Sequence, residues 1–152
     1  MDPVRQHHDA FQVAGLAART TNREEDDPAT ARIGALWRRF FGEQTYASTP
    51  NRTSDLHIFG VYSAYESDAH GAFDITVGVA VSGGAGGVTI EAGDYLVFTG
   101  QGEMPQMVIA TWQRIWQYFE AHPEIARRYQ SDFEAYEGPD KVAIHIGVSG
   151  VS

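Results

Sequence analysis

Apolar residues recur along this chain at two spacings, and the shorter spacing predicts its strands. Runs of apolar and aromatic side chains with brief interruptions are typical of strands. The segments with this pattern are 11–20, 56–65, 73–82, 88–90, 95–99, 132–137 and 142–148. Because only Gly138-Pro139-Asp140 separates the last two segments, we expect them to pair as an antiparallel hairpin.

The longer spacing, of three and four residues, predicts two amphipathic helices. Asp26 and Asp27 precede Pro28, an order typical of a helix start, and Gly42 is placed to end this first helix. We expect the second helix to begin at Pro105 and to end at Ala121-His122-Pro123. The expected apolar faces consist of Ile33, Leu36, Trp37, Phe40 and Phe41 in the first helix and Val108, Trp112, Ile115, Trp116 and Phe119 in the second.

The two halves of the chain repeat one order of elements. An offset of 79 positions carries Leu16, Ile33, Leu36, Trp37 and Phe40 onto Tyr95, Trp112, Ile115, Trp116 and Phe119. This match predicts an α+β fold built as a tandem strand–helix–strand–strand repeat, with halves at about 11–82 and 88–150 in a single domain of residues 11–150. Both helices would lie on one face of a shared antiparallel sheet, with a central groove along the pseudo-twofold axis.

Two segments lie outside this repeat. Residues 1–10 are polar, and we expect them to form a mobile tail. The glycines of the segment 82–87 are followed by neither Lys-Ser nor Lys-Thr, nor by a helical pattern, so they do not form a phosphate-binding loop. We expect a mobile, non-catalytic turn or linker there.

Composition excludes several classes of function. The chain has 152 residues and a net charge of −9, which argues against direct nucleic-acid binding and favours cationic partners. It has no cysteine, no apolar run that could span a bilayer and no signal-peptide core, so we expect a cytoplasmic protein without disulfides. The histidines show no metal-ligand spacing, and we expect neither a metal nor another cofactor.

The candidate chemistry lies in the predicted strand Asp132-Phe133-Glu134-Ala135-Tyr136-Glu137-Gly138. Alternation along a strand puts Asp132, Glu134 and Tyr136 on one face, and Phe133 and Ala135 on the other. A carboxylate beside an aromatic ring suits a cation, since the ring face attracts positive charge and the carboxylate pairs with it. The alternative is that Glu134 is a solvated strand residue.

Four segments together resemble the GyrI-like effector-binding superfamily, over nearly the whole chain after its first ten residues. They are Gly15-Leu16-Ala17-Ala18-Arg19-Thr20, Ile58-Phe59-Gly60-Val61-Tyr62, Ile90-Glu91-Ala92-Gly93-Asp94-Tyr95-Leu96-Val97-Phe98 and the Phe-Glu-x-Tyr strand at Phe133 to Tyr136. The superfamily includes the ligand-binding domains of AraC-type and MerR-type multidrug regulators, the Rob C-terminal domain and stand-alone proteins. The resemblance therefore implies the same architecture of two helices, one sheet and a central groove.

The resemblance also implies a ligand site. Members of the superfamily bind lipophilic cations in the central groove, where a buried glutamate on the Phe-Glu-x-Tyr strand contacts the ligand. That role carries over to Glu134, with Tyr136 beside it. Further aromatic residues that we expect to line the groove are Trp37, Trp112, Trp116, Tyr62 and Tyr95.

Three functions follow as hypotheses. The first is a stand-alone protein that binds hydrophobic, cationic aromatic compounds, for ligand sensing or for sequestration. The second is a hydrolase of small electrophiles, with Glu134 as general base and Tyr136 as hydrogen-bond donor. The third is inhibition of a target enzyme by contact, which no residue supports. About ten residues precede the first strand, too few for a helix-turn-helix, so a role in transcription regulation would need a protein partner or a fused neighbour. A homodimer is also compatible with the sequence.

Overall fold

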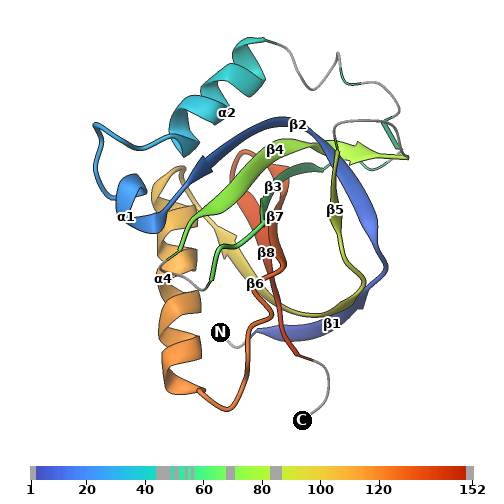
Figure 1. Cartoon of the computed structure of the whole chain (residues 1–152), viewed down its shortest axis with the longest axis vertical. Coiled ribbons are helices and arrows are strands. Elements are labelled where there is room, and N and C mark those ends of the chain that lie inside the picture. Colours follow the sequence, from blue (N-terminus) through green and yellow to red (C-terminus); the bar gives the residue numbers. More distant parts are fainter. Residues whose placement is uncertain are drawn as a thin grey trace.

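The computed structural model describes residues 3–43, 49, 52–53, 55, 57–67, 71–82 and 87–149. Within these residues the chain forms one antiparallel sheet of eight strands together with helices (Figure 1). The elements in chain order are β1 (Val4–His8), β2 (Phe11–Thr20), α1 (Asn22–Glu25), α2 (Ile33–Gly42), β3 (Ile58–Ser63), β4 (Phe73–Val81), β5 (Gly87–Ile90), β6 (Gly93–Gln101), α4 (Gln106–Ala121), β7 (Ser131–Gly138) and β8 (Lys141–Gly147).

The sheet curls because the chain crosses twice from one of its edges to the other. The strand order is β1-β6-β8-β7-β3-β4-β2-β5. Only residues 9–10 separate β1, at one edge, from β2, near the other edge, and only residues 91–92 connect β5 to β6. These short connections draw the two edges of the sheet together, as Figure 1 shows. The curled interior is filled by an apolar cluster that includes Val13, Phe59, Tyr95 and Phe133.

The N-terminal segment corrects one prediction. Residues 4–8 form the edge strand β1, paired with β6 from Val4↔Val97 to His8↔Gly93, where the sequence predicted a mobile tail. The strand is polar and largely exposed, so it carries no apolar alternation that could have revealed it. An ion pair between Arg5 and Asp94 (3.0 Å) adds to the backbone pairing.

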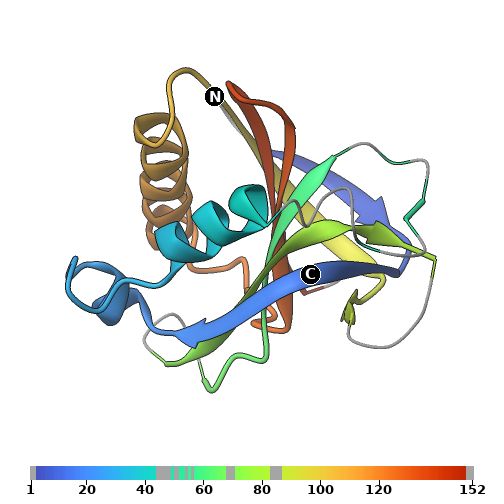
Figure 2. The ribbon, with the colours of Figure 1, turned by 90° about the horizontal axis from the view of Figure 1, so that it is seen from above.

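Two strand–helix–strand–strand units account for most of the fold, as the repeat in the sequence predicted. They are β2-α2-β3-β4 and β6-α4-β7-β8. Helix α2 packs on β2 and β4, helix α4 packs on β6, and both lie on the same face of the sheet (Figure 2). The α+β prediction is therefore confirmed. Among the described residues, none of the helices has the length and apolar character that crossing a bilayer requires.

The start of the first long helix differs from the prediction. Helix α2 begins at Ile33 and not at Pro28, and the separate short helix α1 precedes it. Thr21 starts α1 because its hydroxyl accepts a hydrogen bond from the Glu24 amide (3.0 Å). The Glu25 carboxylate then accepts the amides of Arg32 (2.8 Å) and Ile33 (3.0 Å), which fixes the start of α2.

Other boundaries agree with the sequence within two residues. Helix α4 follows Pro105 and ends at Ala121, and β7 and β8 pair as an antiparallel hairpin. Residues 83–86 of the glycine-rich segment lie outside the described residues.

Candidate functional site

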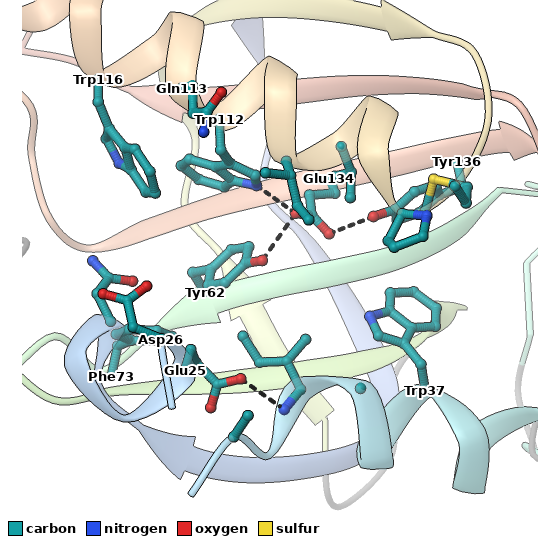
Figure 3. Close-up of a pocket in the computed structure, with 18 of the residues that line it drawn as sticks. Glu25, Asp26, Trp37, Tyr62, Phe73, Trp112, Gln113, Trp116, Glu134 and Tyr136 are labelled. Atoms are coloured by element: carbon teal, nitrogen blue, oxygen red, sulfur yellow. Dashed lines mark hydrogen bonds between the residues drawn. The ribbon is translucent and has the colours of Figure 1, made fainter. Parts of the chain in front are cut away.

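A groove with a volume of about 570 Å³ lies between helices α2 and α4. Its floor is the centre of the sheet, where Tyr62 on β3 and Glu134 and Tyr136 on β7 face the helices (Figure 3). Helix α2 contributes Trp37 to one wall, and α4 contributes Trp112 to the other. The strand alternation predicted for 132–138 is confirmed, since Phe133 and Ala135 on the opposite face belong to the cluster inside the curled sheet.

Glu134 lies at the centre of this floor and is only 2% exposed. Its Oε2 accepts hydrogen bonds from the indole Nε1 of Trp112 (2.7 Å) and the hydroxyl of Tyr62 (2.9 Å). Its Oε1 accepts a third from the hydroxyl of Tyr136 (2.8 Å), as the dashed lines in Figure 3 mark. The alternative that Glu134 is a solvated strand residue is therefore wrong.

A glycine makes room for this carboxylate. Gly60 on β3 is the residue paired with Glu134 in the register between β3 and β7. A Cβ at Gly60 would lie 2.8 Å from Glu134 Oε1 and 3.3 Å from Trp37 Cζ2, closer than side chains normally approach. The missing side chain thus lets the carboxylate lie against the backbone of β3.

Burial raises the pKa values of the titratable side chains on the floor of the groove. Desolvation raises the pKa of Glu134, and the hydrogen bonds from Trp112, Tyr136 and Tyr62 offset part of that rise. Burial and the neighbouring Glu134 charge raise the pKa values of Tyr62 and Tyr136 well above their ordinary value. The two tyrosines therefore stay neutral and act as donors.

A second buried carboxylate, two residues away on β7, is held differently. Asp132 accepts hydrogen bonds from Tyr65 Oη (2.5 Å), the Gly147 amide (2.7 Å) and Arg127 Nη2 (2.8 Å). The contact with Arg127 is an ion pair whose side chains are 8% and 0% exposed. Glu134 forms no ion pair within the described part of the chain, so its negative charge is hydrogen-bonded but has no counter-charge.

Aromatic rings form both walls of the groove, and the wall on α4 continues into an exposed rim. Trp37 meets Tyr136 edge to face at 5.3 Å, and Trp112 meets Tyr62 in the same way at 5.2 Å. Trp116 lies one turn beyond Trp112 on α4 and is 47% exposed, so it belongs to the open rim and not to the core face where the sequence placed it. Met104 and Ile109 extend this exposed apolar rim.

Six of the seven aromatic and acidic residues expected at the site line this groove: Trp37, Tyr62, Trp112, Trp116, Glu134 and Tyr136. Tyr95 does not, because it is fully buried on the opposite face of the sheet, where its hydroxyl donates to the Glu91 carbonyl (2.7 Å). Tyr95 lies in the first strand of the second repeat, and the sequence does not indicate which face of the sheet its ring occupies.

The sequence prediction missed Phe73 and Gly60. Tyr65 and Phe73 line the groove from the ends of β3 and β4, and Gly60 lies beneath Glu134. The alternation of β3, which puts Gly60 and Tyr62 on one face, could have indicated the glycine. Among the described residues, no group of three His, Asp or Glu side chains converges as metal ligands would.

Comparisons with known proteins show the family of this chain and show that its fold recurs in other proteins. The family model of the integron-associated effector binding protein, Cass2, matches residues 6–148. The integron cassette protein VCH_CASS2, from the mobile metagenome of Vibrio cholerae, is 34% identical with a TM-score of 0.83, covering 97% of this chain and 96% of that one. The structure of SAV2435 bound to tetraphenylphosphonium has a TM-score of 0.80 at 20% identity, covering 99% and 95%.

A relative with a curated name also spans the chain. The protein YobU of Bacillus subtilis strain 168, whose name proposes a role as a transcriptional regulator, is 29% identical over 94% of each chain. Together, these likenesses confirm the resemblance to GyrI-like effector-binding proteins that the sequence indicated.

Proposed function

Since the chain belongs to the family of integron-associated effector binding proteins, we propose that it binds hydrophobic, cationic aromatic small molecules in the groove between α2 and α4. The observation that carries this proposal is the buried Glu134 carboxylate, which lacks a counter-charge while Asp132 nearby has Arg127. A buried charge is costly unless it is paired, and a ligand cation would supply the missing partner.

The walls of the groove support the aromatic part of this proposal. The rings of Trp37, Trp112 and Trp116 line the groove and can contact the rings of an aromatic ligand, and cations are attracted to such ring faces. SAV2435, which shares the fold, has been solved with the aromatic cation tetraphenylphosphonium. Ligand sensing through a protein partner, and sequestration, are the roles that fit a binding protein of this kind.

The hydrolase alternative receives less support from the same geometry. A general base needs a free lone pair directed at a water molecule, whereas three donors already occupy the Glu134 carboxylate. No second observation favours catalysis, and we keep binding as the proposed activity.

The direct test is Glu134→Gln. Glutamine keeps the shape of the side chain but removes its charge, so the affinity for tetraphenylphosphonium should fall about tenfold or more, because two opposite unit charges about 6 Å apart attract each other by about 3 kcal/mol at an effective dielectric constant of about 20. Neutral triphenylphosphine oxide should lose little. Tryptophan quenching measures both, since all three tryptophans of the chain line the groove.

Glu120→Gln is the matched control, because Glu120 is an exposed glutamate on α4 outside the groove. Equal losses of affinity for the cation and the neutral compound in Glu134→Gln would mean that this substitution altered the shape of the groove and not only its charge. No loss for either compound would refute the role of Glu134.

A further inference from the structure

The hydrogen-bonding capacity of Glu134 is nearly exhausted before any ligand arrives. A carboxylate offers about four acceptor positions. Trp112 and Tyr62 take two on Oε2, and Tyr136 takes one on Oε1. All three donors are neutral groups, so when the carboxylate is ionised they satisfy the hydrogen-bonding needs of its oxygens without cancelling its charge.

The last position on Oε1 is also obstructed. Oε1 lies against β3 where Gly60 has no side chain, and Trp37 borders the same space. The residue as a whole is 2% exposed. A ligand N–H can therefore reach the carboxylate only by displacing one of the three donors, which would leave a buried hydroxyl or indole N–H without its acceptor.

From this geometry we infer that the groove selects cations without N–H donors, such as quaternary ammonium and phosphonium ions, over primary ammonium ions of the same skeleton. The inference rests on the proposed function, because it assumes that the ligand is a cation held near Glu134. A primary ammonium ion would give up its hydrogen bonds to water and find no acceptor at the centre of the groove. A quaternary ion has no such donors to satisfy, and its charge is felt through space and by the ring faces.

Three further acceptor side chains of the groove do not remove this penalty. Glu25 already accepts hydrogen bonds from Thr20 and from the Arg32 and Ile33 amides. Asp26 and Gln113 are exposed at the rim, where water competes for every hydrogen bond. A ligand N–H could meet these two side chains only in a position away from the buried charge.

A matched ligand series tests the inference. The probes are biphenylmethyl-trimethylammonium, biphenylmethylammonium and the neutral biphenylmethyl methyl ether, measured by tryptophan quenching at a pH where the primary amine is protonated. We expect the quaternary ion to bind about tenfold more tightly than the primary ion. If both cations bind more tightly than the ether but the primary ion equals or exceeds the quaternary one, the inference fails and the proposed function stands. If neither cation exceeds the ether, the proposed function fails as well.

Two variants separate hydrogen bonding from ligand size. Tyr136→Phe removes the donor to Oε1 and opens an acceptor, so the preference for the quaternary ion should shrink several-fold, chiefly through tighter binding of the primary ion. Tyr62→Phe does the same at Oε2 and serves if the first variant is unstable. Tyr118→Phe, a tyrosine of α4 that packs on Phe98 away from the groove, should leave the ratio unchanged. If the ratio in Tyr136→Phe and in Tyr62→Phe equals that of the wild type, size alone sets the preference and the inference is overturned.

Discussion

Glu134 and its neighbours show how a single position in a strand acquires a role through residues far away in sequence. Alternation along β7 is readable from the sequence, and it correctly grouped Asp132, Glu134 and Tyr136 on one face. Alternation does not say which carboxylate receives a counter-charge, because that depends on Arg127 in the segment after α4. It also does not reveal that Gly60 on β3 leaves space for the Glu134 side chain.

Gly60→Ala should therefore weaken binding without touching the ligand. The added Cβ would meet both Glu134 Oε1 and Trp37, and overpacking of this kind costs about 1–3 kcal/mol. We expect a lower midpoint in thermal unfolding and an affinity for tetraphenylphosphonium reduced by about tenfold. Gly42→Ala is the control, since nothing lies within 4 Å of a Cβ there. Wild-type affinity in Gly60→Ala would show that the carboxylate has more freedom than its contacts indicate.

The raised pKa of Glu134 predicts a pH dependence with a definite sign. A cation favours the ionised carboxylate, so affinity should increase as pH rises through the pKa of the empty site and then level off. Tyr62 and Tyr136 do not titrate in this range because their pKa values are raised well above the ordinary value. His145, whose pKa is lowered to about 4 by burial, stacks on Phe133 on the opposite face of the sheet and does not face the groove.

The free energy of unfolding should change with pH in the direction opposite to the affinity. The folded protein holds the Glu134 proton more tightly than the unfolded chain does, so this group lowers the free energy of unfolding as pH rises from its ordinary pKa through the raised one. Titrations of tetraphenylphosphonium affinity and of urea unfolding between acid and neutral pH measure both trends. Glu134→Gln should remove the contribution of this group to both trends, so the difference between wild type and variant isolates it. A pH-dependent affinity that persists in this variant would assign the titration to another group.

At the scale of elements, helix starts depend on caps that the local pattern does not show. The apolar spacing correctly predicted the body of α2, but Asp26, Asp27 and Pro28 wrongly indicated its start. Arg32, the residue before α2, makes no side-chain cap, and Glu25 from α1 supplies the acceptor instead. A cap that comes from a neighbouring helix cannot be read from spacing within one helix.

Glu25→Ala tests this cap. Loss of a capping side chain costs about 1 kcal/mol, which corresponds to a fall of about 2–4 °C in the unfolding midpoint of a protein of this size. The loss should also loosen the wall that carries Trp37, with a small decrease in affinity. Glu43→Ala, which breaks only the exposed Arg39–Glu43 pair at the other end of α2, should change the midpoint little. If both variants melt alike, Glu25 does not cap α2.

At the scale of the whole molecule, the curled sheet separates a structural interior from a ligand-facing exterior. The repeat in the sequence predicted the two units and the common face of their helices, because each unit carries its own apolar pattern. It could not predict that β1 and β2 lie near opposite edges, since strand neighbours such as β1 and β6 are far apart in sequence and β1 is polar. For the same reason it placed Tyr95 in the groove when the curl puts that ring inside.

The last prediction concerns the buried ion pair that joins distant parts of this fold. Asp132 connects β7 to Tyr65 after β3, to Arg127 after α4 and to Gly147 at the end of β8. Asp132→Asn would leave Arg127 buried without a counter-charge, and breaking such a pair costs about 3–5 kcal/mol. Urea unfolding should show this loss, while Asp74→Asn, which breaks the exposed Arg19–Asp74 pair, should cost less than about 1 kcal/mol.

A second substitution distinguishes the charge from the shape of Asp132. Adding Arg127→Met to Asp132→Asn removes the orphaned cation, so part of the lost stability should return. Glu134→Gln, on the same face of the same strand, should instead hold or raise stability, because no cation in the described part of the chain pairs with Glu134. Opposite effects at these two positions are expected only if one carboxylate stabilises the fold and the other is kept for a ligand. Equal destabilisation would show that Glu134 is structural as well, and would leave the groove without its charged residue for binding.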